Sequence, residues 1–363
     1  MDKMAAGNPF KEALNWTKPQ EILEPALKKA KKASFPEKSR WMANKKEEVI
    51  GKIKVLAEEL VRRLQQLVKA YPSLDDIHEF YRSIVEIWTS TSEVKETLTV
   101  AWRAQFKIRN LAGRYIKRID QMELEGKRGI EKLIQVKKAA YGRICSVIKD
   151  LDEELAFLSR ITKKLAGLPD YDPSYPAVVV AGPPNSGKST LIKNVSKAKV
   201  EIASYPFTTK KITFGHVNLD INPFVSLRTQ IVDTPGLFDR PLDERKKPEI
   251  LALKAIRHLA DAVIILLDGS LTNPLDPEGQ KAIYNTIRFF FKKKEYLVTI
   301  NKLDIGNENV LTSLESFLSE NEEDVLKISL KENIHTDLLL EKVGELLKGT
   351  RFLRETPLDK VQD

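Results

Sequence analysis

The spacing of hydrophobic residues changes near residue 170. Before that point, apolar residues recur every three or four positions within long polar stretches, which is the period of an amphipathic helix. Beyond it, short β-rich apolar runs alternate with amphipathic segments, and no strand-like alternation occurs before residue 175. The pattern predicts an all-α long-helix bundle followed by an α/β domain with a mostly parallel sheet and helices on both faces.

Clusters of proline, serine and threonine set the limits of the expected helices. The first helix enters near Thr17–Glu21, and further helices are expected at about 37–70, 73–88, 93–123 and 127–166. Ser73 and Asp76 are spaced like a capping box at the start of the third. The last carries a narrow apolar seam for packing against other helices. Its residues are Ile144, Ile148, Leu151, Leu155 and Leu158.

Proline and glycine between Gly167 and Pro176 cannot continue a helix and mark a linker. Strands are expected beyond it at 176–181, 226–232, 262–267 and 296–300. Helices are expected between them at 188–197, 247–259, 277–293 and 308–319. The expected domains are therefore a helical bundle at 1–168, an α/β domain at 169–350 and a short tail at 351–363.

Composition excludes several classes of protein. A single cysteine, Cys145, excludes a disulfide scaffold and a cysteine-based metal cluster. The longest apolar run, Ala262–Leu267, is far shorter than the roughly 18 residues that a membrane span requires. The polar N-terminus does not resemble a secretory signal. We therefore expect a soluble intracellular protein with no membrane contact.

The net charge of +9 is concentrated in the first half of the chain. Residues 1–170 carry a net charge of +10, whereas the remainder carries −1. On a helical wheel, five cations fall within about 100° of one another, apart from an apolar side. These are Arg103, Lys107, Arg114, Lys117 and Arg118. Such a face could contact phosphates of RNA, although most charged helix faces are merely solvated; no DNA contact is expected.

A phosphate-binding P-loop is the strongest chemical motif. The segment fits the pattern G-x-x-x-x-G-K-[ST] between an expected strand and an expected helix. It reads Gly182-Pro183-Pro184-Asn185-Ser186-Gly187-Lys188-Ser189-Thr190. Its backbone N–H groups and Lys188 would bind the β- and γ-phosphates, and Ser189 would bind Mg²⁺. The alternative is a chance glycine-rich turn.

Two further segments between 205 and 236 could respond to a γ-phosphate. Asp233, at the end of an apolar strand, could hold Mg²⁺, and Gly236 would let a backbone N–H approach the phosphate. Upstream, Tyr205-Pro206-Phe207-Thr208-Thr209 contains two threonines, and spacing alone does not decide which completes the Mg²⁺ shell. An ordinary loop that leads into a strand at Ile212 is the alternative.

Asn301-Lys302-Leu303-Asp304 follows an expected strand at the sheet edge where open α/β folds bind ligands. The Asp304 carboxylate can accept hydrogen bonds from N1–H and the exocyclic amine of guanine, neither of which adenine offers there. The motif therefore favours GTP over ATP. Asn301 and Lys302 would brace the base, and Ser329-Leu330-Lys331 would form a further loop against it.

Together these motifs resemble the Obg-type branch of the translation-factor GTPases. Asp239–Arg245 and His258–Asp261 resemble, more narrowly, the nucleolar GTP-binding protein 1 family, and Tyr71–Tyr81 resembles that family's helical domain. The resemblance covers about residues 5–350. It implies a P-loop GTPase domain and a function in assembly of the large ribosomal subunit. It further implies switch loops at Tyr205–Thr209 and Asp233–Arg240, with Thr209 as the Mg²⁺ ligand.

The resemblance also bears on location and catalysis. The chain length matches the compact archaeal form, which implies a cytoplasmic location; a nucleolar location applies only to a eukaryotic source.

Leu237 stands where related GTPases place a water-orienting glutamine, so intrinsic hydrolysis is expected to be slow. In related GTPases an asparagine placed like Asn185 binds K⁺. The expected catalytic residues are Lys188, Asn185, Thr209 and Gly236; Arg240 acts in cis or is simply solvated.

Two other functions are consistent with the sequence. One is a placeholder whose nucleotide pocket is structural, and the other is a signalling GTPase whose helical bundle binds a protein effector instead of rRNA. The expected ligands are GTP or GDP with Mg²⁺. The expected partner is a precursor of the large ribosomal subunit, bound through its rRNA and proteins.

Overall fold

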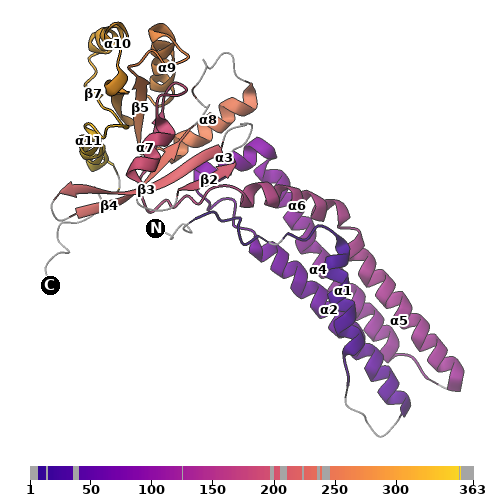
Figure 1. The fold of residues 1–363 in the computed structure, drawn as a ribbon. Helices are drawn as coiled ribbons and strands as arrows, with labels where there is room; N and C mark the ends of the chain where they lie inside the picture. The colour runs from indigo at the N-terminus through magenta and orange to yellow at the C-terminus, as the bar shows by residue number, and fades with distance from the viewer. Residues whose placement is uncertain are drawn as a thin grey trace, which may run out of the picture. The chain divides into compact units, whose positions relative to one another are not determined.

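The computed structural model describes residues 7–13, 15–35, 41–124, 126–196, 200–204, 211–222, 225–234, 238, 246–350 and 352. Contacts between residues divide the chain into two compact units (Figure 1). The helical unit comprises 9–76 and 88–166. The sheet unit comprises the described residues among 1–8, 77–87 and 167–363. These units differ from the expected division at residue 168, which remains a prediction about domains.

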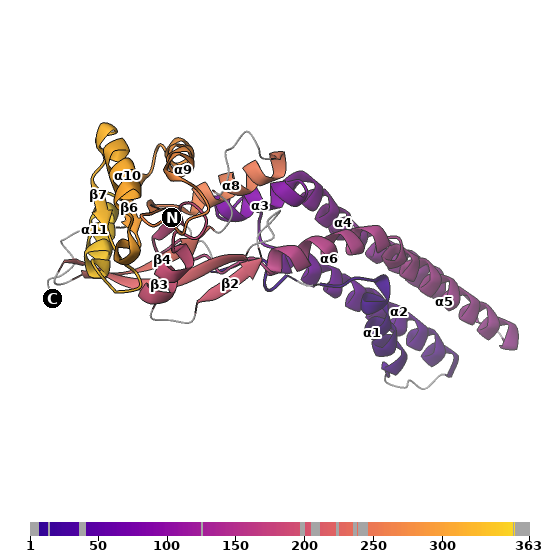
Figure 2. The same cartoon turned by 45° about the horizontal axis from the view of Figure 1, so that its top comes forward.

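Long helices form the helical unit because apolar residues recur along one side of each. They are α1 (Pro19–Lys32), α2 (Trp41–Ala70), α4 (Thr91–Asp120), α5 (Gly126–Lys149) and α6 (Asp152–Ala166). α2 packs against α1, α4 and α5, and α4 and α5 run side by side (Figures 1 and 2). All five seam residues between Ile144 and Leu158 are buried.

Two expected helices differ most from the structure. The helix expected at 127–166 is interrupted by a turn at Asp150–Leu151, after which the Leu155 N–H donates to the Leu151 carbonyl at 2.9 Å. The helix expected from Ser73 begins instead at Glu79, because Asp76 N–H donates back to the Ser73 carbonyl at 3.0 Å and closes a turn.

Helix α3 (Glu79–Trp88) groups with the sheet unit over residues 77–87. The Tyr81 hydroxyl donates to the Pro169 carbonyl at 2.9 Å and accepts from the Tyr171 N–H at 3.0 Å. Both tyrosines are buried, and the Phe80 ring meets the Tyr171 ring edge-on at 6.2 Å. This aromatic cluster holds the linker against α3.

The described residues of the sheet unit include a seven-stranded, mostly parallel sheet in the order β2-β3-β4-β1-β5-β6-β7. β2 and β4 run antiparallel to β3, and the other pairs are parallel. The strands are β1 (Ala177–Ala181), β2 (Glu201–Ser204), β3 (Lys211–Asn222), β4 (Val225–Asp233), β5 (Ala262–Asp268), β6 (Glu295–Asn301) and β7 (Val325–Lys327).

Helices cover both faces of this sheet. They are α7 (Lys188–Val195), α8 (Lys247–Leu259), α9 (Pro277–Phe290), α10 (Glu308–Glu320) and α11 (Thr336–Lys348). α7 and α11 share one apolar core with alternate strand residues such as Val178 and Ile264. α8 contacts β1 and α9 contacts β5, where the intervening residues Val179 and Val263 are also buried. Among the described helices, none has the length and apolarity to cross a bilayer.

Candidate functional site

The loop between β1 and α7 lies at the carboxyl end of the sheet's central strand. Glycine is required at its two ends, where another residue's Cβ would clash. A Cβ on Gly182 would lie 2.1 Å from the Leu266 carbonyl oxygen, and one on Gly187 would lie 2.3 Å from Asn301 Nδ2. Gly187 also has a φ of 104°, and Asn185 has a φ of 60°. The loop is therefore tightly curved, and the Leu266 carbonyl of β5 and the Asn301 side chain pack closely against its two ends.

Lys188 lies across this loop. Its side chain is buried, and its Nζ donates to the carbonyl oxygens of Gly182 at 3.0 Å and Pro183 at 2.6 Å. The helix that begins at Lys188 adds positive potential from its N-terminus. The ammonium and the loop thus present the charge and donors that a polyphosphate requires.

Ser189 and Asp233, the expected Mg²⁺ ligands, are in contact. Val180 pairs with Asp233 across β1 and β4, and the Ser189 hydroxyl donates to the fully buried Asp233 carboxylate. Nearby, the Thr234 hydroxyl donates to the Val180 carbonyl at 2.9 Å. A hydroxyl and a carboxylate beside a polyphosphate loop are the oxygen donors that Mg²⁺ prefers, so the residues present fit this ion.

Several expected site residues lie outside the described residues. They are Phe207, Thr208 and Thr209 of the first switch segment, and Gly236, Leu237 and Arg240 of the second. Their roles remain predictions.

Asn301, the last residue of β6, joins two loops at the carboxyl edge of the sheet. It is 3 % exposed, its Nδ2 donates to the Ser186 carbonyl at 2.8 Å, and its Oδ1 accepts from the Leu330 N–H at 3.1 Å. One buried side chain therefore links the phosphate loop, the end of β6 and the loop after β7.

Asp304 is held from the side by the loop after β7. Its Oδ1 accepts from the Ser329 hydroxyl at 2.6 Å, and its side chain is 12 % exposed. Lys331 Nζ lies 4.0 Å from Asp304 Oδ2 on an exposed side chain. The structure thus brings Asp304, Ser329, Leu330 and Lys331 together, with a carboxylate fixed in direction, and their contact with a base stays a prediction.

The sequence interpretation did not identify a further buried carboxylate, that of Asp268. Its Oδ2 lies 2.6 Å from Lys302 Nζ and accepts from Asn273 Nδ2 at 2.9 Å. The same Asn273 amide donates to the Pro184 carbonyl at 2.8 Å, so this network supports the phosphate loop from a second direction. Asp268 directly follows the apolar run at 262–267, a position that could have indicated a residue at the ligand-binding edge.

In the helical unit, the five cations of the predicted basic face are all exposed on α4: Arg103, Lys107, Arg114, Lys117 and Arg118. Ile108, Ala112 and Ile119, from the expected apolar side, are buried. Trp102 and Phe106 are also exposed, at 39 % and 48 %, with ring centroids 6.0 Å apart. These two aromatic residues lie beside the basic face, and the sequence interpretation overlooked them.

Comparisons with known proteins agree with this two-part arrangement. Residues 10–172 match the family described as NOG1 N-terminal helical domain, and residues 177–302 match 50S ribosome-binding GTPase. An uncharacterized protein of Methanocaldococcus jannaschii is 31 % identical over 304 residues, which cover 83 % of this chain and 82 % of that protein. Nucleolar GTP-binding protein 1 of Saccharomyces cerevisiae is 30 % identical over 254 residues, or 70 % of this chain.

The chain belongs to the nucleolar GTP-binding protein 1 family. This confirms the family and the fold class predicted from sequence, a helical domain followed by a P-loop GTPase domain. The matched segment covers 38 % of the Saccharomyces nucleolar GTP-binding protein 1. A crystal structure of nucleolar GTP-binding protein 1 from Plasmodium falciparum matches with 25 % identity and a TM-score of 0.42, over 50 % of this chain and 90 % of that one.

Proposed function

We propose that this chain binds GTP with Mg²⁺ and hydrolyses it to GDP and phosphate, slowly on its own. The observation that carries the proposal is the position of the Asp304 carboxylate. Ser329 fixes it, and Asn301 in the same tetrad holds the phosphate loop through the Ser186 carbonyl. A carboxylate so placed can accept both donors on the Watson–Crick edge of guanine, so base recognition and phosphate binding occur at one sheet edge.

The proposed chemistry depends on neutralising charge. Lys188, released from its contacts with the Gly182 and Pro183 carbonyls, would bind the β- and γ-phosphates. Ser189 and Asp233 would hold Mg²⁺, which supplies positive charge to the phosphate oxygens. Water attacks the γ-phosphorus, the bond to the β–γ bridging oxygen breaks, and GDP leaves. Thr209 and Gly236 would sense the γ-phosphate, and Asn185 would hold K⁺ in place of a catalytic arginine.

We further propose that the chain acts in assembly of the large ribosomal subunit and contacts its RNA through α4. Exposed cations on one face of α4 can neutralise phosphates, and Trp102 and Phe106 can stack on unpaired bases. The match to 50S ribosome-binding GTPase and the relatives' name support this function. In an archaeal-type cell this function would be cytoplasmic.

Asp304→Asn tests the nucleotide assignment. Xanthine carries an oxygen where guanine carries its exocyclic amine. The asparagine NH2 would donate to that oxygen of xanthine, whereas with guanine it would face the exocyclic amine, which is also a donor. We expect GTP affinity to fall by about 100-fold or more and XTP affinity to rise, as measured with fluorescent nucleotides. Asp324→Asn, an exposed carboxylate of the same unit, is the matched control. An unchanged preference for GTP over XTP in Asp304→Asn would contradict the proposal.

A further inference from the structure

The loop after β5 is built around the fully buried carboxylate of Asp268. Its Oδ1 accepts from the Ser270 N–H at 2.9 Å and from the Ser270 hydroxyl at 2.7 Å. Its Oδ2 lies 2.6 Å from Lys302 Nζ and accepts from Asn273 Nδ2 at 2.9 Å. The Gln280 side-chain amide bonds to both the N–H and the carbonyl of Asp268, at 2.9 and 3.0 Å. These contacts fix the carboxylate in position and direction.

Asn273 uses both hydrogens of its side-chain amide. One is donated to Asp268 Oδ2, and the other is donated to the Pro184 carbonyl at 2.8 Å. Its Oδ1 accepts from the Leu275 N–H at 3.0 Å. Turning the amide over would place its oxygen against two other acceptors, so only one orientation satisfies the neighbouring groups. Asn273 therefore holds the Pro184 carbonyl in a fixed direction.

The direction of the Pro184 carbonyl determines the direction of the N–H that follows it. The peptide between Pro184 and Asn185 is trans, and in a planar trans peptide the C=O and N–H groups point to opposite sides. The Pro183 carbonyl accepts from Lys188 Nζ within the phosphate loop. The next carbonyl points instead to Asn273, in a different loop. The Asn185 N–H is therefore directed away from Asn273.

The backbone at Asn185 is also shaped for an anion, because its φ of 60° is left-handed. A left-handed residue in a tight turn directs neighbouring N–H groups into one concave anion-binding site. Such donors accelerate a reaction most where negative charge develops, which in GTP hydrolysis is on the phosphate oxygens. The direction of the Asn185 N–H should therefore affect the rate of hydrolysis more than the affinity for GDP.

We propose that Asn273 is a positioning residue for GTP hydrolysis, which directs the Asn185 N–H toward the phosphate oxygens by holding the Pro184 carbonyl. Asp268 keeps Asn273 in place and, through Lys302, joins this support to the tetrad at the base end of the site. Asn273 and Asp268 act through the peptide that follows Pro184 and not by contact with the nucleotide. The proposal rests on the proposed GTPase function and adds two residues to it.

Asn273→Ala in the full chain removes the contact with Pro184. Single-turnover GTP hydrolysis should slow by about 10- to 100-fold, because a small misplacement of a catalytic donor costs up to about 100-fold in rate. GDP affinity should change little. Nucleotide should slow hydrogen exchange of the Asn185 amide in the unmodified chain, and by a smaller factor in Asn273→Ala.

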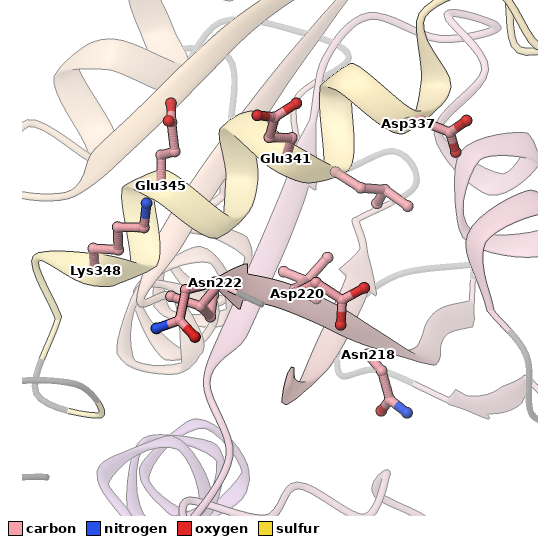
Figure 3. A pocket seen from close by; sticks show the side chains of 10 residues that line it. Asn218, Asp220, Asn222, Asp337, Glu341, Glu345 and Lys348 are labelled. Carbon is pink, nitrogen blue, oxygen red and sulfur yellow. The ribbon is translucent and has the colours of Figure 1, made fainter. Parts of the chain in front are cut away.

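Asn218→Ala is the matched control. Asn218 is exposed on β3 and borders the groove between β3 and α11 (Figure 3). It pairs with Arg228, five residues along β4 from Asp233, which is roughly 17 Å at about 3.3 Å per residue. Hydrolysis and the exchange of the Asn185 amide should be unchanged in this variant.

The exchanged pair Asp268→Asn/Asn273→Asp distinguishes positioning from a purely structural role. It keeps a hydrogen bond between the two positions, an acceptor for the Leu275 N–H and the net charge. It turns a carboxylate oxygen toward the Pro184 carbonyl, so hydrolysis should remain as slow as in Asn273→Ala. Recovery of the normal rate in the exchanged pair would overturn the proposal, because it would show that Asn273 serves only to stabilise Asp268.

The remaining outcomes separate this proposal from the GTPase function itself. Normal hydrolysis in Asn273→Ala, in a chain that binds and hydrolyses GTP, would overturn the positioning role and leave the proposed function intact. If the unmodified chain binds GTP without hydrolysing it, equal protection of the Asn185 amide with and without Asn273 would overturn the positioning role. Absence of nucleotide binding in the unmodified chain would overturn both.

Discussion

The side-chain amide of Asn301 donates to the carbonyl of Ser186 at 2.8 Å, so the tetrad proposed to recognise the base directly holds the phosphate loop. The same side chain accepts from the Leu330 N–H, which ties in the loop after β7. Gly187 lacks a Cβ where Asn301 crosses beneath it. In the proposed function, base recognition and phosphate binding would therefore share one buried residue, and a change at Asn301 should affect both.

Asn301→Ala is expected to weaken GTP and GDP binding together, by about 10- to 100-fold. It removes one side chain that makes two buried hydrogen bonds, and each unpaired group costs roughly 1–3 kcal/mol. Isothermal titration with both nucleotides measures the effect. The matched variant Asn309→Ala, at an exposed position on α10, should bind normally. Loss of GTP affinity alone would show that Asn301 acts on the γ-phosphate end and not on the whole loop.

Gly187→Ala should abolish nucleotide binding. The new Cβ would meet Asn301 Nδ2 at 2.3 Å, and a φ of 104° disfavours any side chain. Gly142→Ala is the control, since Gly142 is exposed within α5 with open space around its Cβ position. That variant should gain about 0.5–1 kcal/mol in the free energy of unfolding of the helix. Filter binding with labelled GTP and thermal melting distinguish the two outcomes.

Single-turnover GTP hydrolysis is expected to be faster in potassium than in sodium chloride. Asn185 lies in the phosphate loop with a φ of 60°, and its neighbour Pro184 is held by Asn273. Asn185→Ala should remove the difference between the salts while GDP affinity stays nearly unchanged. Equal rates in both salts, together with insensitivity to this substitution, would refute the K⁺ hypothesis.

Binding measurements with large-subunit particles should distinguish the contribution of the α4 cations from that of aromatic stacking on α4. Replacing Lys107 or Arg114 by glutamine should lower the slope of log affinity against log salt by about 1 each. Trp102→Ala should instead cost about 1–3 kcal/mol of binding with an unchanged slope. Sedimentation with the particles over a salt series measures both quantities, and Lys31→Gln, exposed on α1, serves as the control. Salt-independent binding would contradict RNA contact by this face.

Acid should destabilise the helical unit because it protonates the Glu59 carboxylate. Hydrogen bonds from Arg62, and then from Lys29, hold the pKa of Glu59 at about 2, although burial opposes them. Because the folded pKa lies below the ordinary value of 4.5, the stabilisation is complete above pH 4.5 and is lost as the pH falls toward 2. The cations are largely exposed, which limits the contribution to about 1–2 kcal/mol.

Glu59→Gln should therefore destabilise α2 by about 1–2 kcal/mol at pH 7 and have little effect near pH 2. Hydrogen exchange of α2 amides at the two pH values measures the difference. Glu58→Gln, at an exposed neighbouring position, should change neither value. An equal loss of stability at both pH values in Glu59→Gln would mean that the packing of Glu59, and not its charge, stabilises α2.

The sequence predicts local motifs well and the extent of some elements poorly. Strand limits at β1, β4, β5 and β6 agree within one or two residues, because each is a short apolar run with polar ends. β3 is expected only near Ile212, since its buried residues switch from even positions, such as Phe214, to odd ones, such as Val217. That switch breaks the two-residue period by which a strand is recognised.

Other features depend on tertiary contacts. The apolar seam continues through Leu151, so periodicity does not reveal the turn that separates α5 from α6. An amphipathic pattern shows that α3 has an apolar side but does not show which core that side joins. Asp268 and Asn273 lie five residues apart in an ordinary loop, and only the fold brings Asn273 to Pro184.

The grouping of α3 with the sheet unit has a consequence for inheritance. The chain crosses between the two contact units four times, at 8–9, 76–77, 87–88 and 166–167. A recombination breakpoint between Trp88 and Pro169 would separate Pro169 from Tyr81 and leave the GTPase part without a helix whose aromatic residues are buried. We therefore expect the two parts to be inherited together and not to be exchanged separately between genes.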